Sequence, residues 1–191
     1  MEEYKDKKYI SREFLYAKGY SQYKVNRLTE DGDLVKINRR YFENPDYTGD
    51  ADDNCAVNAY APEGVICLVS AAIYHELTTS RPLQIDVALP RRSRVPESPV
   101  SPRMRFYLFS EDRYFAGIDT IDEDGNGFMI YDREKTVCDV LFYRNKLGFE
   151  TAIEILKNYL ERPDRDLNRL MSYAKMLRSE KLLREYLEVM I

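Results

Sequence analysis

Residues 11–42 read SREFLYAKGYSQYKVNRLTEDGDLVKINRRYF and carry the signals of two short helices followed by a β-hairpin. Ser11 and Ser21 each stand where a side-chain hydroxyl can accept from a free backbone N–H of a first helical turn. Gly19 and Gly32 follow the two expected helices, and glycine readily takes the left-handed conformation that ends a helix. The pattern predicts one helix after Ser11 and a second one between Ser21 and Gly32.

The side chains around these signals complete the unit. The first helix is expected to bury Ile10, Phe14, Leu15 and Ala17. After Gly32, apolar residues favour two short strands, the first with Leu34, Val35 and Ile37 and the second with Tyr41 and Phe42. Residues 38–40 form a basic tip between the two strands. The order of helix, turn, helix and basic-tipped hairpin is that of a winged helix-turn-helix module.

At about 100° per residue, the second helix has an apolar side and a separate polar stripe. Glutamine and asparagine can pair with adenine, and arginine can bind guanine or a phosphate. The side chains expected to contact duplex DNA are Ser21, Gln22, Tyr23, Lys24, Asn26 and Arg27 of this helix and Lys36, Asn38, Arg39 and Arg40 of the hairpin.

Charge supports this interpretation only modestly. Between Arg12 and Arg40 there are seven Lys or Arg against four acids, a local net charge of +3 in a chain of net charge −4. Winged helices also dock proteins, and a polar stripe is what any solvated helix shows. A protein-docking module therefore stands beside DNA binding as the alternative.

The whole chain has 191 residues, 44% of them hydrophobic, which is enough for a well-packed core. We expect a DNA-binding domain over residues 1–50 and a second domain over 51–191, with an acidic linker at residues 44–54. The charged start does not resemble a signal peptide, and the longest apolar stretch, Val65–Tyr74, is too short to cross a membrane. Three widely spaced cysteines indicate reduced packing residues, and the protein is predicted to be cytoplasmic.

The second domain is predicted to combine a buried helix, a small sheet and a helical cluster, so the expected fold class is α+β. The mostly apolar run Gly64–Thr79 predicts a buried helix of about three turns. Alternating residues indicate a strand over Leu83–Leu89, ended by Pro90. Further strands are expected over Met104–Ser110, Tyr114–Ile121 and Gly127–Tyr131. Helices are expected over residues 133–147, 152–160, 167–177 and 182–190, the first of them capped by Asp132 and ended by Gly148.

Residues 91–105 form the most basic stretch of the chain. They include five arginines, one acid and three prolines, a composition that favours an extended surface segment. This segment is either a solvated loop or a second phosphate-binding patch. The arginines of the possible patch are Arg91, Arg92, Arg94, Arg103 and Arg105.

Catalytic chemistry has few candidate residues. His75 is the only histidine, and a nucleophilic pair with one of the cysteines is conceivable. Cys67 precedes His75 by eight residues, about two turns of the expected helix. His75 is therefore expected to bond a backbone group, Thr78 or Thr79 near the end of that helix instead. Asp139 is expected to be a structural acid balanced by Lys135 one turn earlier, with a functional role as the alternative.

Metal and cofactor signals are weak. The aspartates of the linker have no partner ligands at a recognisable spacing. The turn-rich segment 122–127 resembles a calcium loop, but Thr120 and Tyr131 fall where that loop requires acids. With no phosphate-cradling glycine loop, zinc ligand set or paired-carboxylate motif, we expect no catalytic residue, no metal and no cofactor.

Three blocks of sequence resemble the antitoxins of the AbiEi family. The run Gly64–Thr79 and the strand end Val87-Ala-Leu-Pro90 are similar to one family signature. Residues 135–139 (KTVCD) and 142–148 (FYRNKLG), followed by Ala152 and Glu154, are similar to another. The winged-helix pattern also lies where this family has it. One departure is the hairpin tip, where relatives often carry glycine.

The resemblance implies a function that the residues alone do not. Members of the family are antitoxins of abortive-infection toxin–antitoxin pairs, encoded beside a nucleotidyltransferase-like toxin. Their winged helix represses the operon by binding inverted repeats in its own promoter, and the C-terminal domain neutralises the toxin, usually without a stable complex. We therefore expect an autorepressor and antitoxin, monomeric or weakly dimeric. Its alternative is a module that neutralises the toxin by direct binding.

Overall fold

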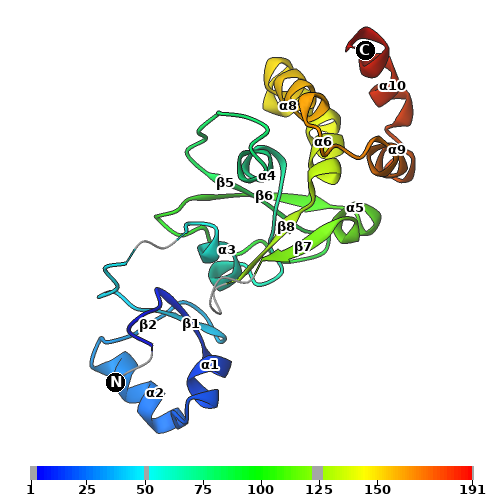
Figure 1. Cartoon of the computed structure of the whole chain (residues 1–191). Coiled ribbons are helices and arrows are strands. Elements are labelled where there is room, and N and C mark those ends of the chain that lie inside the picture. The colour runs from blue at the N-terminus through cyan, green and yellow to red at the C-terminus, as the bar shows by residue number, and fades with distance from the viewer. Residues whose placement is uncertain (1–3, 50–51, 122–126, 191) are drawn as a thin grey trace.

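A computed structural model describes residues 4–49, 52–121 and 127–190. The fold is α+β, with a small sheet in an N-terminal head and a larger sheet in a body that also carries a helical layer (Figure 1). The head and the helical layer lie at opposite ends of the molecule, and the body sheet lies between them (Figure 1). Among the described residues, no helix is both long and apolar enough to cross a bilayer.

The head, residues 4–49, packs two short helices against a three-stranded antiparallel sheet of order β1-β3-β2. Both predicted N-caps are confirmed: Oγ of Ser11 accepts from the Phe14 amide at 3.0 Å, and Oγ of Ser21 from the Lys24 amide at 3.3 Å. The predicted glycine at the end of each helix has a positive φ, +81° and +85°. The elements are β1 (Tyr9–Ser11), α1 (Arg12–Ala17), α2 (Gln22–Glu30), β2 (Val35–Lys36) and β3 (Tyr41–Glu43).

The prediction that Ile10 belongs to the first helix was wrong. Ile10 lies in β1, in register with Phe42 of β3, and both side chains are buried. The helix begins only after its cap, so an apolar residue before Ser11 is free to enter an extended strand. The head sheet therefore has a third strand that the hairpin pattern did not indicate.

The body sheet has the order β6-β5-β4-β8-β7. Its β4–β8 and β5–β6 pairs are parallel, whereas β4–β5 and β7–β8 are antiparallel. The predicted strand positions are confirmed except for the third, where residues 111–115 form helix α5 before β7 begins. The connection between β7 and β8, the predicted calcium-like turn, falls at 122–126, outside the described residues. The elements are β4 (Val65–Ile66), β5 (Ile85–Pro90), β6 (Met104–Phe109), α5 (Glu111–Phe115), β7 (Ile118–Ile121) and β8 (Phe128–Tyr131).

The predicted three-turn helix over Gly64–Thr79 was wrong in its first part. The segment begins as the short central strand β4 and only then forms α4 (Leu68–Tyr74). A Cβ on Gly64 would lie 2.7 Å from Cγ1 of Val87, so this close approach to β5 requires glycine. A strand and a helix that are both buried have the same apolar composition, so periodicity could not separate them.

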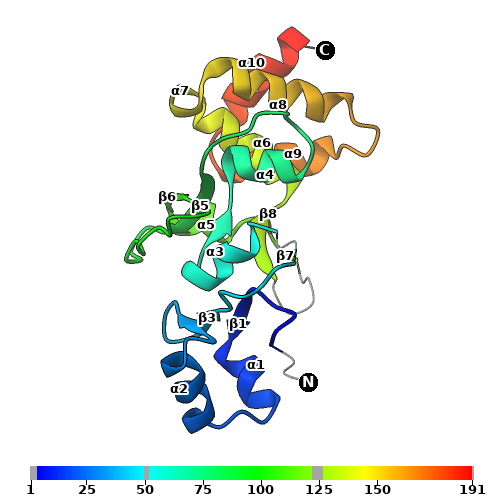
Figure 2. The same cartoon turned by 90° about the vertical axis from the view of Figure 1, so that its left-hand side faces the viewer.

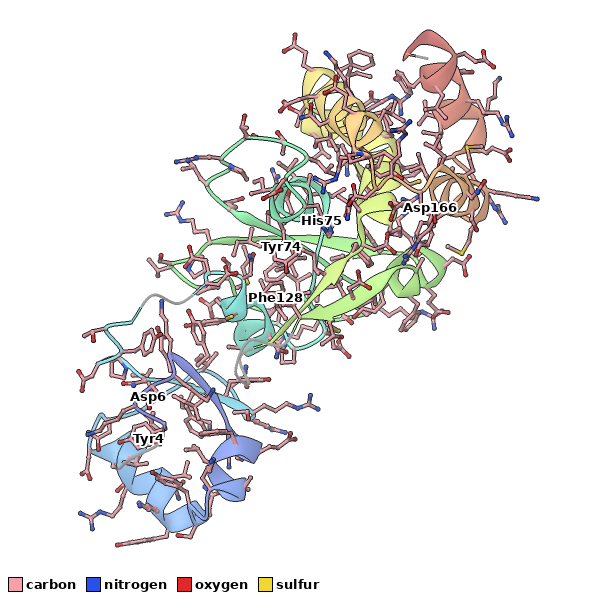
Figure 3. All side chains as sticks on the ribbon, in the orientation of Figure 1. Tyr4, Asp6, Tyr74, His75, Phe128 and Asp166 are labelled. Atoms are coloured by element: carbon pink, nitrogen blue, oxygen red, sulfur yellow. The ribbon has the colours of Figure 1, made fainter. Side chains whose placement is uncertain are left out.

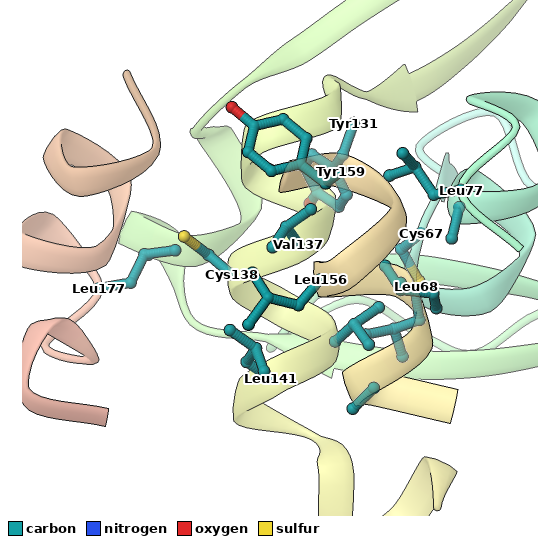
Figure 4. Packing of buried hydrophobic residues seen from close by; sticks show 14 of the residues in the cluster. Cys67, Leu68, Leu77, Tyr131, Val137, Cys138, Leu141, Leu156, Tyr159 and Leu177 are labelled. Atoms are coloured by element: carbon teal, nitrogen blue, oxygen red, sulfur yellow. The ribbon is translucent and has the colours of Figure 1, made fainter. Parts of the chain in front are cut away.

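The helical layer follows the predicted pattern of four helical runs. Oδ1 of Asp132 accepts from the Lys135 amide at 2.8 Å, which confirms the predicted cap, and Gly148 ends the first run with a φ of +100°. Helix α6 is at the centre of the core, where α4, α8 and α9 pack around it (Figure 4). The helices are α6 (Arg133–Phe142), α7 (Arg144–Leu147), α8 (Phe149–Glu161), α9 (Leu167–Met176) and α10 (Glu180–Met190).

The head rests on α3 (Cys55–Tyr60), a short helix that lies between the two sheets (Figure 2). Three side-chain hydrogen bonds join the head to α3. Nδ2 of Asn38 donates to the Ala59 carbonyl at 2.6 Å, Nδ2 of Asn58 donates to the Tyr41 hydroxyl at 3.0 Å, and the Tyr60 hydroxyl donates to Oε2 of Glu43 at 3.2 Å. The far ends of α1 and α2 point away from the body (Figure 2). The predicted linker, of which residues 50 and 51 are not described, leads into α3.

Candidate nucleic-acid interface

Helix α2 presents the predicted polar stripe to solvent. Val25 and Leu28 are buried in the head core, whereas every side chain predicted to face DNA on this helix is exposed. Tyr23 retains 73% of its accessible surface, so its ring is held by few contacts. The helical periodicity therefore placed the buried and exposed sides of α2 correctly.

The stripe is tied to α1 by a hydrogen-bond network that the sequence did not indicate. Nη1 of Arg12 donates to Oε1 of Gln22 at 2.9 Å, and the Tyr16 hydroxyl donates to the same oxygen. Nε2 of Gln22 in turn donates to Oδ1 of Asn26 at 2.7 Å, one turn further along α2. Four side chains from two helices therefore hold the exposed surface in one arrangement.

This network fixes the orientation of both amide groups. A guanidinium can only donate, so the Gln22 atom that faces Arg12 must be the oxygen. The Gln22 nitrogen therefore faces Asn26, and the Asn26 atom that it meets must be an acceptor. Both lone pairs of the Gln22 oxygen are used, whereas one N–H of Gln22, two N–H of Asn26 and one lone pair of the Asn26 oxygen have no partner among the described residues. The surface offered by the pair is rich in donors.

The basic residues of α2 differ in how firmly they are held. The Lys24 ammonium lies 4.2 Å from the centre of the Tyr20 ring, a cation–π contact. Nε of Arg27 lies 3.9 Å from the Asp31 carboxylate, and both side chains are more than half exposed. Such an exposed pair contributes little stability and leaves Arg27 available to an anion.

The hairpin tip contains one structural residue, Asn38, and two exposed cations, Arg39 and Arg40. Oδ1 of Asn38 accepts from the amides of Arg40 and Tyr41, and its Nδ2 donates to α3, so three of the four hydrogen-bonding capacities of this side chain are used within the protein. Arg39 and Arg40 are exposed, as is Lys36 in β2. The three cations, rather than Asn38, form the accessible basic group of the hairpin.

The arginines of the second basic segment, residues 91–105, also fall into one structural residue and several exposed ones. Arg105 lies in β6, and its Nη2 and Nε donate to one oxygen of Asp86, at 2.7 and 2.9 Å. Asp86 is completely buried, so Arg105 serves as its counter-ion. The other four, Arg91, Arg92, Arg94 and Arg103, are exposed and form no ion pair among the described residues. An open cleft of about 620 Å³ lies beside Arg103, with Arg81 and Tyr74 also in its lining.

The body interior contains an ionic cluster of two cations and one acid. Asp139 is completely buried and pairs with Lys135 on its own helix and with Arg113 of α5. Burial raises the pKa of Asp139, and the two cations oppose that rise. Nζ of Lys135 lies 3.9 Å from the centre of the Tyr131 ring, and the Arg113 guanidinium 4.0 Å from that of Phe142. The predicted Lys135–Asp139 pair is confirmed, whereas Arg113 was missed because nothing local indicates it.

His75 occupies a structural position. Its Nε2 lies 2.7 Å from the Tyr131 carbonyl, so the partner is a backbone group, as predicted, but it lies in β8 and not near the end of the histidine's own helix. The His75 ring meets that of Tyr74 edge-on; both residues are labelled in Figure 3. Burial lowers the pKa of His75. Burial also raises the pKa of Cys138 to about 12, and that of Cys67 well above its usual value. All three cysteines are buried and none forms a disulfide in the described part of the chain; the thiols of Cys67 and Cys138 stay protonated and unreactive at neutral pH.

A comparison of the chain with protein-family models and with curated proteins finds no match.

Proposed function

We propose that the head is a winged helix-turn-helix and that it binds duplex DNA with α2 in the major groove. The observation that carries the proposal is the exposed stripe of α2, whose amides are held by Arg12 and Tyr16 and which includes the exposed cations Lys24 and Arg27. A side chain fixed before binding loses less entropy when it meets a base edge. The hairpin cations Lys36, Arg39 and Arg40 would neutralise flanking phosphates.

The donor-rich surface suggests which bases are contacted. A bidentate contact to adenine needs one acceptor and one donor on the same amide, and the Gln22 oxygen is already occupied twice. Guanine presents two acceptors, N7 and O6, in the major groove. The remaining N–H of Gln22 therefore favours guanine at the base pair that faces it, whereas Asn26 keeps a donor and one acceptor lone pair and can also pair with adenine.

The resemblance to AbiEi antitoxins supplies the biological setting of this proposal. The chain would repress its own operon by binding inverted repeats in the promoter, and its body would antagonise a nucleotidyltransferase-like toxin without a stable complex. It would act in the cytoplasm and would not be an enzyme. Arg91, Arg92, Arg94 and Arg103 remain candidates for additional phosphate contacts, whereas Arg105 is bound to Asp86.

Direct capture of the toxin is the second candidate function. A groove of about 470 Å³ between α9 and α10 exposes apolar side chains, among them Leu167, Met171 and Leu187. Such a groove could accept an amphipathic helix. Co-elution of the toxin with this chain in size exclusion would favour this function over antagonism without a complex.

The DNA-binding proposal is tested by gel shift on the chain's own promoter fragment. Arg27→Ala, or Arg39→Ala together with Arg40→Ala, should weaken binding by about tenfold or more while the melting temperature is preserved. Lys157→Ala is the matched control, because Lys157 is an exposed cation on α8 whose ion-pair partner, Glu161, is also exposed and lies 3.9 Å away. Equal DNA affinity of the wild type, Arg27→Ala, the Arg39→Ala/Arg40→Ala double variant and Lys157→Ala would refute the proposed contacts. The neighbouring open reading frame tests the wider setting, since it should encode a nucleotidyltransferase-like protein.

A further inference from the structure

The open cleft of about 620 Å³ beside Arg103 is formed by four segments that are distant in sequence. Its lining comes from the residues just before α3, from α4, from the segment between α4 and β5, and from the segment that leads into β6. Because β5 and β6 are parallel and Ile85 is in register with Met104, the last two segments enter the sheet at the same end. The cleft therefore lies where these two parallel strands begin.

Four large apolar side chains that line the cleft are exposed to solvent. Leu83 and Val100 retain 95% and 90% of their accessible surface, and Ile73 and Tyr74 of α4 are more than one-third exposed. Single exposed apolar side chains are common on protein surfaces, whereas several that line one cleft indicate a binding site. The volume of the cleft is within the range of about 300–1,000 Å³ in which proteins bind small molecules.

Two arginines add positive charge to these apolar walls. Arg81 and Arg103 are exposed, and neither forms an ion pair with a described residue. Asp53 is the one acid among the described residues of the lining. A guanidinium presents a planar fork of N–H donors that matches a carboxylate or a phosphate, and beside apolar walls such a contact is stronger than in open water. The cleft thus combines an excess of positive charge with apolar surface.

Both segments that carry these arginines are held by hydrogen bonds within the body. In the first segment, the Thr78 hydroxyl donates to Oε1 of Glu154 on α8 at 2.9 Å, and the Ser80 amide donates to the Thr78 hydroxyl oxygen at 3.2 Å. In the second, the Arg103 carbonyl accepts from the Ile85 amide at 2.8 Å. The backbone on both sides of the cleft is therefore positioned before a ligand arrives, which reduces the entropy lost on binding.

We propose that this cleft binds a small organic anion, with its carboxylate or phosphate group at Arg81 and Arg103 and its apolar body against Tyr74, Leu83 and Val100. Such a ligand supplies the negative charge that the two arginines lack within the chain and covers the exposed apolar side chains at the same time. The phosphate backbone of DNA would contact the arginines and leave the apolar walls uncovered. The proposal does not depend on DNA binding by the head.

Fluorescence titration of the full chain with anilinonaphthalene sulfonate (ANS) tests the charged part of the site. ANS carries a negative charge on an aromatic body, and phenylnaphthylamine is the same body without the charge. The wild type should bind ANS saturably. Arg81→Gln with Arg103→Gln should weaken ANS binding by about tenfold or more and leave the affinity for phenylnaphthylamine unchanged.

Arg91→Gln with Arg92→Gln is the matched control, because it removes the same charge from two exposed arginines outside the cleft lining. All four side chains are exposed, so both double variants should keep the melting temperature of the wild type. A wild type that does not bind ANS saturably overturns the proposal. So does an equal loss of ANS affinity in the two double variants.

A pair of valine variants tests the apolar part of the site. Val100→Ser should weaken the binding of ANS and of phenylnaphthylamine by about threefold or more, because both probes bury the same apolar surface. Val95→Ser is the matched control, since Val95 is an exposed valine of the same segment and lies outside the cleft lining. Equal affinities of the two variants for both probes would exclude the proposed apolar contact.

Competition against bound ANS tests the chemistry of the ligand. Octanoate or octyl phosphate should displace ANS at a concentration at which octanol, which has the same alkyl chain, does not. The anion that displaces ANS at the lower concentration assigns the carboxylate or the phosphate as the preferred group. Displacement by octanol as readily as by either anion, or by none of the three, would overturn the proposal.

Discussion

Arg113 and Asp139, 26 residues apart in sequence, form a salt bridge inside the body, where the Asp139 carboxylate is completely buried. Lys135 reaches the other oxygen of the same carboxylate from one turn earlier on α6. The cluster holds two cations and one anion, so the negative charge of Asp139 is the counter-charge for both Lys135 and Arg113. Its removal would leave two buried positive charges without a counter-ion, the costliest way to break a buried pair.

We therefore expect Asp139→Asn, which keeps the shape and removes the charge, to lower the free energy of unfolding by about 3–5 kcal/mol. Urea denaturation measures this loss. Glu161→Gln is the control, because Glu161 belongs to an exposed pair with Lys157 at 3.9 Å and should change stability by less than about 1 kcal/mol. Losses of equal size in the two variants would show that the buried cluster has no special importance.

His75 should make stability depend on pH. Burial holds its pKa below the ordinary value of 6.5; Arg133 acts in the same direction, whereas Asp132, Asp119 and the bond to the Tyr131 carbonyl oppose it. Between the lowered pKa and 6.5, the unfolded chain binds a proton that the folded chain does not, so stability falls as pH falls through this window. His75→Gln should flatten the dependence of unfolding free energy on pH just below neutrality. If His75→Gln leaves the slope of unfolding free energy against pH unchanged, other titratable groups cause the pH dependence.

DNA binding should depend steeply on salt. The proposed contacts include cations on α2 and at the hairpin, and each neutralised phosphate releases counter-ions. For about five phosphates, log affinity against log salt should fall with a slope of about −4 to −5. Fluorescence anisotropy on the promoter fragment measures the slope, and Arg39→Ala with Arg40→Ala should reduce its magnitude by about 2. A slope near zero would argue against phosphate contacts.

Base preference should respond to a residue outside α2. Tyr16→Phe removes a hydroxyl that occupies the Gln22 oxygen, which frees an acceptor and should narrow the preference for guanine over adenine by about tenfold. Selection from a random duplex library, followed by competition, measures the ratio. Tyr186→Phe removes a hydroxyl on α10, at the end of the molecule opposite the head, and should leave the ratio unchanged. Binding by both variants with the wild-type preference would exclude the role given to Tyr16.

Local features of this protein were determined by the sequence alone. The serine and aspartate caps, the glycines at helix ends, the buried side of α2 and the four helical runs after Asp132 all depend on residues within a turn or two of one another. Such interactions are present whatever the rest of the chain does, so spacing predicts them. The Lys135–Asp139 pair is of the same kind, because both residues lie on one helix.

Tertiary structure decided everything that joins distant parts of the chain. Arg113 reaches Asp139, Arg105 binds Asp86, and the apolar run after Gly64 divides into a strand and a helix only because the order of the body sheet places β5 and β8 beside it. The Gln22 amide is likewise turned by side chains of α1. These contacts depend on which elements become neighbours in the fold. The spacing of residues within one segment carries no information about that.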